Sequence, residues 1–235
     1  MFSASNLFRV PDHVSDSVRA VCRRIAPRSE PSVVACEQRS ICQQGMCFEN
    51  VARLVADEGG EIVYGWLIWE WPKTVVEAEH HAVWRAGGRL VDVTPQWFQN
   101  PRHVFLSDPG CAFDFEGRRR RDNWRFPLRS DPAVREYMAL AARRIALEEE
   151  HSTGRDVCLT PAAASEMVAL NHQLLRVLGR LAEWSRCNTG RNEACWCGSR
   201  VKHKACHGRE KANGGRGLAD RELLPSTILA HALTH

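Results

Sequence analysis

Three cysteines and one histidine stand close together near the C-terminal end of the sequence. They are Cys195, Cys197, Cys206 and His207, in the stretch GRNEACWCGSRVKHKACHG that covers residues 190–208. A structural zinc site uses about four thiolate or imidazole ligands in a tetrahedron. The C-x-C spacing lets one tight turn direct two sulfurs inward, and the later pair supplies the remaining ligands. This pattern predicts one structural Zn2+ ion with no open coordination position.

The residues between the ligands indicate how the chain folds around the ion. Gly198-Ser199 follows the first two cysteines and would let the chain reverse direction. We expect the run Lys-His-Lys at 202–204 to face solvent. Scattered free thiols or a redox-active C-x-C pair are the alternatives, but a redox pair leaves the later cysteine and histidine without a role.

The same stretch resembles the SEC-C motif, a small zinc-binding element at the C-terminus of the bacterial preprotein translocase ATPase. That family reads GRN, then C-x-C-G-S, a basic run and a final C-C or C-H. This sequence follows the same order, with Trp196 where a proline is common. The resemblance implies zinc binding by the four residues and docking to a protein partner, such as a chaperone, or to the ribosome. No phosphate loop is present, so the sequence does not predict the motor itself.

A second group of residues could carry out nucleophilic catalysis. Cys47 stands where a loop with a glycine meets a predicted helix, and the positive end of a helix dipole favours a thiolate. A cysteine nucleophile also needs a histidine as base and a carboxylate or amide that orients this histidine. The segment EAEHHAVWRAGGRLVDVTP (77–95) offers His80, His81 and Asp92 for these roles.

The geometry of a β-hairpin chooses between the two histidines. A two-residue turn at the glycine pair 87–88 pairs Trp84 with Val91. Because side chains alternate along a strand, His81 and Asp92 then share a face as diagonal neighbours, within reach of a hydrogen bond. The preceding histidine points the other way. A one-residue bulge in the hairpin would reverse this choice.

The same residues allow interpretations without catalysis. Cys47 could be an inert core cysteine, which is the commonest fate of a cysteine, and both histidines could be ordinary strand residues. A further alternative places Cys47, one of the two histidines and Asp92 around a second metal ion.

A resemblance favours the catalytic interpretation. A cysteine at a helix start, then a histidine and an aspartate on successive strands, resembles the order in the papain-like and transglutaminase-like superfamily. HAVWRAGGRLVDVTPQ (81–96) is similar to the transglutaminase-core pattern. The resemblance covers about residues 40–100 and implies Cys47 as nucleophile, His81 as base and Asp92 as orienting residue. The chain also resembles uncharacterised bacterial proteins with a SEC-C tail, which indicates no substrate.

One feature departs from the family pattern. A glutamine some residues before the cysteine often helps to bind the oxyanion in that family. Gln43 and Gln44 lie nearby, but neither has the usual spacing. The backbone N–H of Cys47 is therefore the expected oxyanion donor, with or without a glutamine.

The elements that would position these residues follow from hydrophobic spacing and from helix and turn signals. Helices are predicted over 14–25, 47–58, 131–150 and 160–184, and strands over 62–71, 74–84 and 89–95. Residues 27–46 and 96–130 are predicted to be irregular. The fold class is α+β, with a papain-like or transglutaminase-like core in which the Cys47 helix packs on an antiparallel sheet.

Four regions are expected along the chain. They are an α+β core over 1–130, a helical segment over 131–186, a SEC-C zinc-binding knuckle over 187–210 and a flexible tail over 211–235.

The composition is that of an ordinary globular protein. Among the 235 residues, 44% are hydrophobic and 26% charged, and the net charge is +4. No apolar run approaches the roughly 20 residues that span a bilayer, and the start lacks a secretory signal. We therefore expect a cytoplasmic protein without a membrane partner, in which ten cysteines serve metal binding or catalysis rather than disulfides.

Two hypotheses about function follow. The first is a cysteine hydrolase or acyltransferase acting on an amide or thioester, with the SEC-C element docking a partner or peptide substrate. The alternative is a non-catalytic zinc-binding adaptor that binds a protein partner or the ribosome. Basic residues around the knuckle would allow contact with RNA. They are Arg200, Lys202, Lys204, Arg209 and Lys211.

Overall fold

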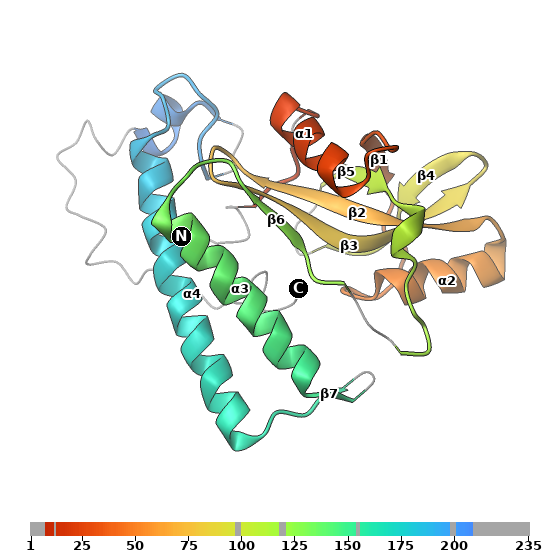
Figure 1. Cartoon of the computed structure of the whole chain (residues 1–235). Coiled ribbons are helices and arrows are strands. Elements are labelled where there is room, and N and C mark those ends of the chain that lie inside the picture. The colour runs from red at the N-terminus through yellow and green to blue at the C-terminus, as the bar shows by residue number, and fades with distance from the viewer. Residues whose placement is uncertain are drawn as a thin grey trace. The chain divides into compact units, whose positions relative to one another are not determined.

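The computed structural model describes residues 8–208, apart from residues 12, 97–99, 118–120, 154–155 and 198–200. Within this part the protein is an α+β structure with four α-helices and a five-stranded barrel (Figure 1). The chain divides into two compact units. One contains Val10–Glu70 and Val76–Phe126, and the other contains the chain up to Arg9, Trp71–Val75 and the chain from Pro127 onward. The tail predicted at 211–235 lies outside the described residues.

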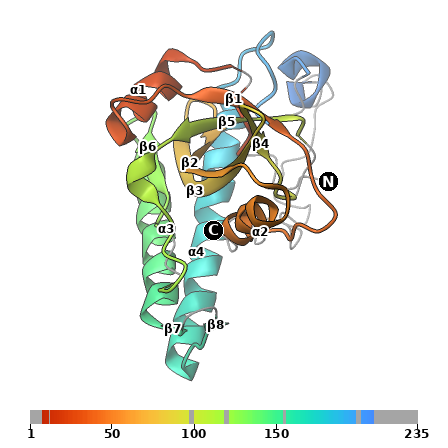
Figure 2. The same cartoon turned by 90° about the vertical axis from the view of Figure 1, so that its right-hand side faces the viewer.

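The barrel is formed by five strands, and a sixth strand extends it. The strands are β1 (Ser32–Cys36), β2 (Glu61–Trp71), β3 (Val75–Ala86), β4 (Arg89–Asp92), β5 (Arg102–Ser107) and β6 (Trp124–Pro127). Their order is β2-β5-β1-β4-β3-β6, and β2 also pairs with β3, which closes the barrel (Figure 2). β1 runs parallel to β4, whereas the β1–β5, β2–β5 and β3–β4 pairs are antiparallel. Chain neighbours therefore form the hairpins, but β1 depends on two strands that come much later in the sequence.

The interior of the barrel is apolar in part and polar in part. One buried cluster consists of Val34, Val63, Val83 and Phe105, with Leu90 packed against it. Side chains on a strand alternate between the two faces, so a residue two positions away shares the interior face. Four of the residues that meet this condition are ionisable and at least partly buried: Cys36, His81, Asp92 and His103.

Helix α2 (Cys47–Glu58) covers the outer face of the barrel sheet, opposite to the interior (Figure 2). Its buried residues Phe48, Val51 and Leu54 pack with Ala82, Trp84, Val91 and Val93. Leu54 is fully buried, and its replacement by alanine would cost about 2–5 kcal/mol. The helix ends at Gly59, whose φ of 76° suits glycine, as the sequence predicted. This packing fixes the position of Cys47 at the start of the helix.

The predicted irregular segments contain strands, and this part of the prediction is wrong. β1 lies within 27–46, and β5 and β6 lie within 96–130. Each of these strands has only four to six residues. Their stability comes from pairing with distant segments: β1, for example, has β5 on one edge and β4 on the other. A short run has no local period strong enough to reveal such pairing.

The predicted helices are all present. α1 (Asp16–Ile25) is capped by the Ser15 side chain, α3 (Pro132–Glu150) by Asp131 and α4 (Pro161–Cys187) by Thr160. In each case the side-chain oxygen accepts a hydrogen bond from a backbone N–H of the first turn. α3 and α4 pack together around Leu147, Ala163 and Leu170. The two-residue strands β7 (Ser152–Thr153) and β8 (Asp156–Val157) pair between these helices along the chain.

The tip of the β2–β3 hairpin belongs to the same unit as α3 and α4. The Trp71 Nε1 donates a hydrogen bond to the Ser185 hydroxyl of α4 over 3.0 Å. The Lys73 ammonium lies 2.7 Å from the Glu193 carboxylate, just before the predicted zinc ligands. These contacts hold the base of the C-terminal segment against the hairpin tip.

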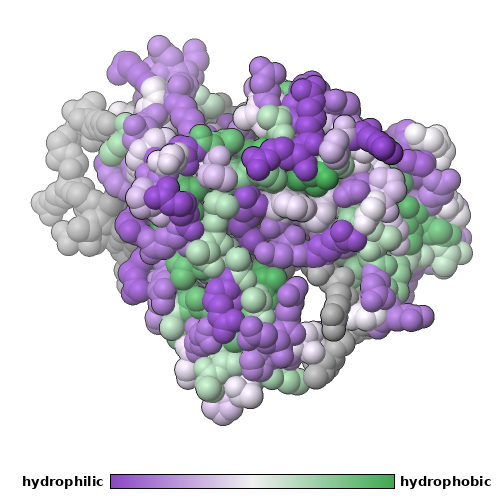
Figure 3. All heavy atoms as spheres, viewed as in Figure 1, coloured by the Kyte–Doolittle hydropathy of each residue, from purple (hydrophilic) through white to green (hydrophobic). Residues whose placement is uncertain are grey.

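Hydrophilic side chains dominate the face shown in Figure 3, with smaller hydrophobic areas between them. In the described part of the chain, no helix has both the length and the apolar character that a membrane crossing requires.

Candidate metal centre and candidate active site

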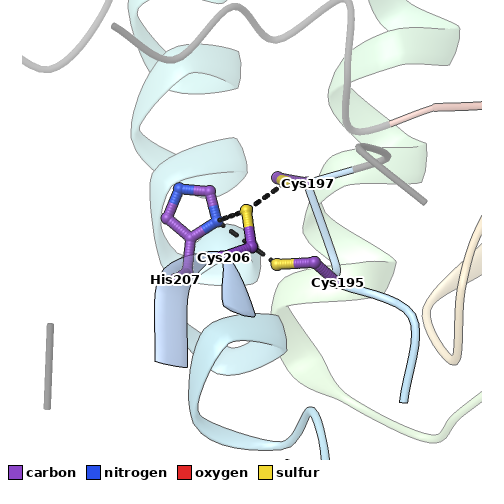
Figure 4. Close-up of side chains that lie close together, drawn as sticks. All are labelled: Cys195, Cys197, Cys206 and His207. Atoms are coloured by element: carbon purple, nitrogen blue, oxygen red, sulfur yellow. Dashed lines mark hydrogen bonds between the residues drawn. The ribbon is translucent and has the colours of Figure 1, made fainter. Parts of the chain in front are cut away.

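The four predicted zinc ligands converge in space. Figure 4 shows the side chains of Cys195, Cys197, Cys206 and His207 pointing toward one another. Their ligand atoms all lie within 4.8 Å of one another. The Nδ1 atom of His207 is 3.2 Å from the sulfur of Cys195 and 3.2 Å from that of Cys206. The sulfurs of Cys197 and Cys206 are 3.7 Å apart.

Backbone hydrogen bonds produce this convergence. The Cys195 N–H donates to the Val201 carbonyl over 2.8 Å, and a bridge joins Ala194 to Lys202. The short 3₁₀ helix η3 (His203–Ala205) then presents Cys206 and its neighbour. Gly198-Ser199, the predicted turn, lies outside the described residues.

The donor set and its geometry fit Zn2+. Zinc–sulfur bonds of about 2.3 Å in a tetrahedron place neighbouring sulfurs about 3.7–3.8 Å apart, as is found for Cys197 and Cys206. Three thiolates and one imidazole are a common structural set, and all four coordination positions come from the protein. Among the described residues, no second group has metal-binding geometry, so the alternative of a second ion at Cys47 gains no support.

The residues proposed for catalysis come from α2, β3 and β4. Cys47 is the first residue of α2, and no side chain caps that helix end. The β3–β4 hairpin has the predicted register, in which Trp84 pairs with Val91. Gly87 and Gly88 have φ angles of 54° and 78°, as a type I′ turn requires.

The two adjacent histidines separate as the alternation predicts. The His80 Nε2 donates to the Cys111 carbonyl over 2.6 Å, while its Nδ1 accepts from the Arg121 N–H. His80 is therefore held away from Asp92. The His81 Nε2 lies 3.2 Å from the Asp92 Oδ2, an ion-pair distance without full hydrogen-bond alignment. Catalytic hydrogen bonds are often misaligned before a substrate binds.

The electrostatics of His81 join it to Cys47. Burial lowers the pKa of His81, but electrostatic interactions with Cys47 and then with Asp92 outweigh burial and hold that pKa well above its ordinary value. Both partners thus lie close enough to stabilise an imidazolium. This interaction is compatible with a thiolate–imidazolium pair, which is the activated form of a cysteine nucleophile.

Asp92 is fully buried and strongly held. Burial raises the pKa of its carboxyl, but the His81 charge and the His103 hydrogen bond lower it far more, so the pKa lies well below its usual range. The His103 Nδ1 donates to Oδ2 over 2.6 Å, and the Thr94 N–H donates to Oδ1 over 3.0 Å. Sequence reasoning missed His103, because β5 was not predicted.

Asn50 is a second residue that sequence reasoning missed. Its side-chain oxygen accepts from the Gln43 N–H over 2.9 Å, and its amide donates to the Gln43 carbonyl over 2.7 Å. The same amide donates to the Thr94 hydroxyl over 3.2 Å. Asn50 thus ties the loop before Cys47 to the residue that holds Asp92. In this network Gln43 acts through its backbone rather than its side chain.

The site is closed to solvent. The exposed fractions of Cys47, His81 and Asp92 are 3%, 1% and 0%. Cys47 packs in the same cluster as Cys42 and Phe113. A substrate carbonyl can therefore reach the sulfur only after these packed side chains open locally.

Comparison with known families bears directly on the metal centre. Residues 191–209 match the SEC-C motif. The match and the cluster of three cysteines and one histidine together fit a zinc-binding SEC-C module. No curated protein and no solved structure matches the chain, so the papain-like or transglutaminase-like likeness receives no support from relatives.

One residue of the SEC-C module differs from expectation. His203 was expected to face solvent together with Lys202 and Lys204, but it is 4% exposed, and only the two lysines are exposed. Its Nδ1 lies 3.5 Å from the Cys195 sulfur. Within η3 successive side chains point in different directions, so the middle residue of the basic run turns inward. The SEC-C module thus has a second imidazole behind its ligands.

Proposed function

We propose that the protein is a cysteine hydrolase or acyltransferase that acts on an amide or thioester bond. Cys47 is the nucleophile, His81 the general base and acid, and Asp92 the residue that orients His81. One observation carries the proposal: a buried histidine lies 3.2 Å from a buried carboxylate, and electrostatic interactions with a helix-start cysteine and with this carboxylate raise its pKa. Isolated buried charges are costly, so such an arrangement is more typical of active sites than of cores.

The reaction follows from these positions. The Cys47 sulfur attacks the substrate carbonyl carbon, and the carbonyl π electrons move onto oxygen. His81 gives its proton to the leaving amine or thiol, which leaves an acyl group on sulfur. His81 then takes a proton from water or from another acceptor, which attacks the acyl carbon and regenerates the thiol. The uncapped N-terminus of α2 supplies backbone N–H groups suited to the oxyanion.

The order of the three residues along the chain supports a relation to the papain-like and transglutaminase-like enzymes as part of this proposal. The SEC-C module would hold its Zn2+ ion with Cys195, Cys197, Cys206 and His207, and the ion would fold the segment rather than take part in the reaction. Exposed Lys202 and Lys204 would help it to dock a partner protein, a peptide substrate or ribosomal RNA. Ten cysteines without disulfides favour a reducing location such as the cytoplasm.

Alkylation kinetics of the zinc-loaded full chain test the active site. Peptide mass spectrometry would follow iodoacetamide labelling of Cys47 between about pH 4 and pH 9, with the exposed Cys158 and Cys187 as internal references. Because Cys47 is buried, its rate also depends on local opening, so each rate is compared with its own maximum at high pH. We expect the Cys47 rate to reach half of its maximum at a lower pH than the rates of both references, below the free-thiol pKa of about 8.5. Replacement of His81 by alanine should lower this rate about 100-fold or more.

The adjacent histidine provides a matched control, because His80→Ala changes the same strand but leaves the Asp92 partner in place. Equal Cys47 rates in the His80→Ala and His81→Ala variants, or a Cys47 rate that rises over the same pH range as that of Cys187, would contradict the proposal. Intact cellular function in a Cys47→Ala variant and its loss in a Cys195→Ser variant would favour the adaptor instead. Amide and thioester panels would then define the substrate of a reactive Cys47.

A further inference from the structure

Asp92 is held from two sides by imidazoles. His81 approaches Oδ2 from β3 at 3.2 Å, and His103 approaches the same oxygen from β5 at 2.6 Å. His103 is fully buried. β5 and β4 are not neighbours, because β1 lies between them, but the small closed barrel brings their interior side chains together.

The hydrogen bonds fix both oxygens of the carboxylate. A carboxylate held by one donor can rotate about its last bond, whereas Asp92 has Thr94 on Oδ1 and His103 on Oδ2. The plane of the Asp92 carboxylate is therefore fixed without any contact from His81. The 2.6 Å contact is in the range of a charge-assisted hydrogen bond, roughly twice as strong as one between neutral groups.

The other ionisable groups that face Asp92 and His81 add little charge. The ionisable groups that act on Asp92 or His81 from packed segments are Cys36 on β1, Cys42 in the loop before α2 and Cys47 on α2. Burial raises the pKa of Cys36 to about 11, and burial also raises that of Cys42, so both thiols stay neutral at neutral pH. The Trp69 ring lies 5.8 Å from the His103 ring, and its Nε1 donates to Glu79.

We infer that His103 is a positioning residue for the reaction proposed above, and the inference rests on that proposal. His103 holds the Asp92 carboxylate in its charged form and in the one orientation that supports His81. It does not touch the reacting atoms. The active unit is therefore a relay of Cys47, His81, Asp92 and His103 drawn from α2, β3, β4 and β5.

Two polar replacements separate positioning from packing. His103→Asn places an amide donor near the position of Nδ1, whereas His103→Gln places it near Nε2, away from Asp92. The readout is the acid limb of the Cys47 alkylation profile, which is the pH range over which the rate rises from its low value at acid pH. In His103→Gln, loss of the donor raises the pKa of Asp92, so we expect the acid limb to shift upward by about one pH unit or more. His103→Asn should keep the profile of the unsubstituted protein.

The outcomes distinguish three cases. If both variants lose thermal stability but keep the original pH profile, His103 is only a packing residue and the inference is overturned. If both variants shift equally, the position of the donor is irrelevant and the inference also fails. If the Cys47 rate in the unsubstituted protein rises over the same pH range as that of Cys187, the proposed function itself fails, whatever the His103 variants do.

Discussion

The SEC-C module and the barrel interior both gather cysteine and histidine side chains, but they assemble them by different means. The module takes all four ligands from one short segment, and its backbone bonds are local. The barrel takes its groups from one helix and three strands, and the closest contact joins β4 to β5 across β1. A local site depends on its ion for stability, whereas a distributed site depends on the whole fold.

Zinc removal should separate the two regions most strongly. Structural zinc contributes about 10–16 kcal/mol in small peptide sites. Chelation, or a Cys206→Ser substitution, should abolish hydrogen-exchange protection in 191–208 while protection in β3 and β4 persists. Cys187→Ser, which changes an exposed cysteine, is the control. Simultaneous loss of protection in the barrel would show that the barrel also depends on the metal.

Removal of the buried Asp92 carboxylate in the barrel should have the next largest effect. Asp92→Asn leaves two buried imidazoles without their carboxylate and should cost about 3–5 kcal/mol near pH 6 in urea denaturation. His81 has a raised pKa, so its stabilisation is complete below the unfolded pKa of about 6.5 and is lost as pH rises through the folded pKa. The pKa of Asp92 is lowered, so its contribution is lost only as pH falls below about 3.9.

The unsubstituted protein should accordingly lose stability as pH rises above about 6.5, and the Asp92→Asn variant should show a flatter alkaline slope. Identical slopes in the two proteins would mean that Asp92 does not set the protonation of His81.

The Asn50 network should contribute less. Asn50→Ala leaves the Gln43 N–H and carbonyl without their partner and should cost about 2 kcal/mol. It should also slow Cys47 alkylation, because the loop before the nucleophile is released. Asn50→Asp keeps the acceptor for the Gln43 N–H but loses both donor bonds. Its stability should therefore lie between that of the unsubstituted protein and that of Asn50→Ala. A stable Asn50→Ala protein with an unchanged Cys47 alkylation rate would show that Asn50 does not position the loop before Cys47.

Within the SEC-C module, His203 should have the smallest effect. A group that hydrogen-bonds a zinc ligand typically tunes affinity by 10–100-fold, so His203→Leu should weaken zinc binding about tenfold in a competition titration with a chelator. Lys204→Leu changes an exposed neighbour and should leave the affinity unchanged. Equal effects of both substitutions would assign the change to the local surface rather than to Cys195.

Features with a local cause could be predicted from the sequence. The helix caps at Ser15, Asp131 and Thr160 each need one side chain and the turn that follows it. The glycine pair set the register of β3 against β4, and this register selected His81 over His80. The four metal-binding positions likewise lie in one segment.

Features that depend on long-range pairing could not be predicted. His103 stands in a short strand whose partners lie far away along the chain, so no local period marks it. The closure of the barrel and the parallel β1–β4 pair belong to the same class. His203 was missed for a different reason, since a short 3₁₀ turn changes the direction of each successive side chain.

The central place of β1 has a consequence for biosynthesis. β1 is made first among the strands, but both of its partners, β4 and β5, follow only after α2, β2 and β3. At about 5–20 residues per second, several seconds of translation pass before both edges of β1 can be paired. During that interval β1 presents two open edges to other chains. A nascent chain of this protein should therefore need shielding until Ser107 has emerged, and truncation before β5 should give an aggregating product rather than a smaller folded one.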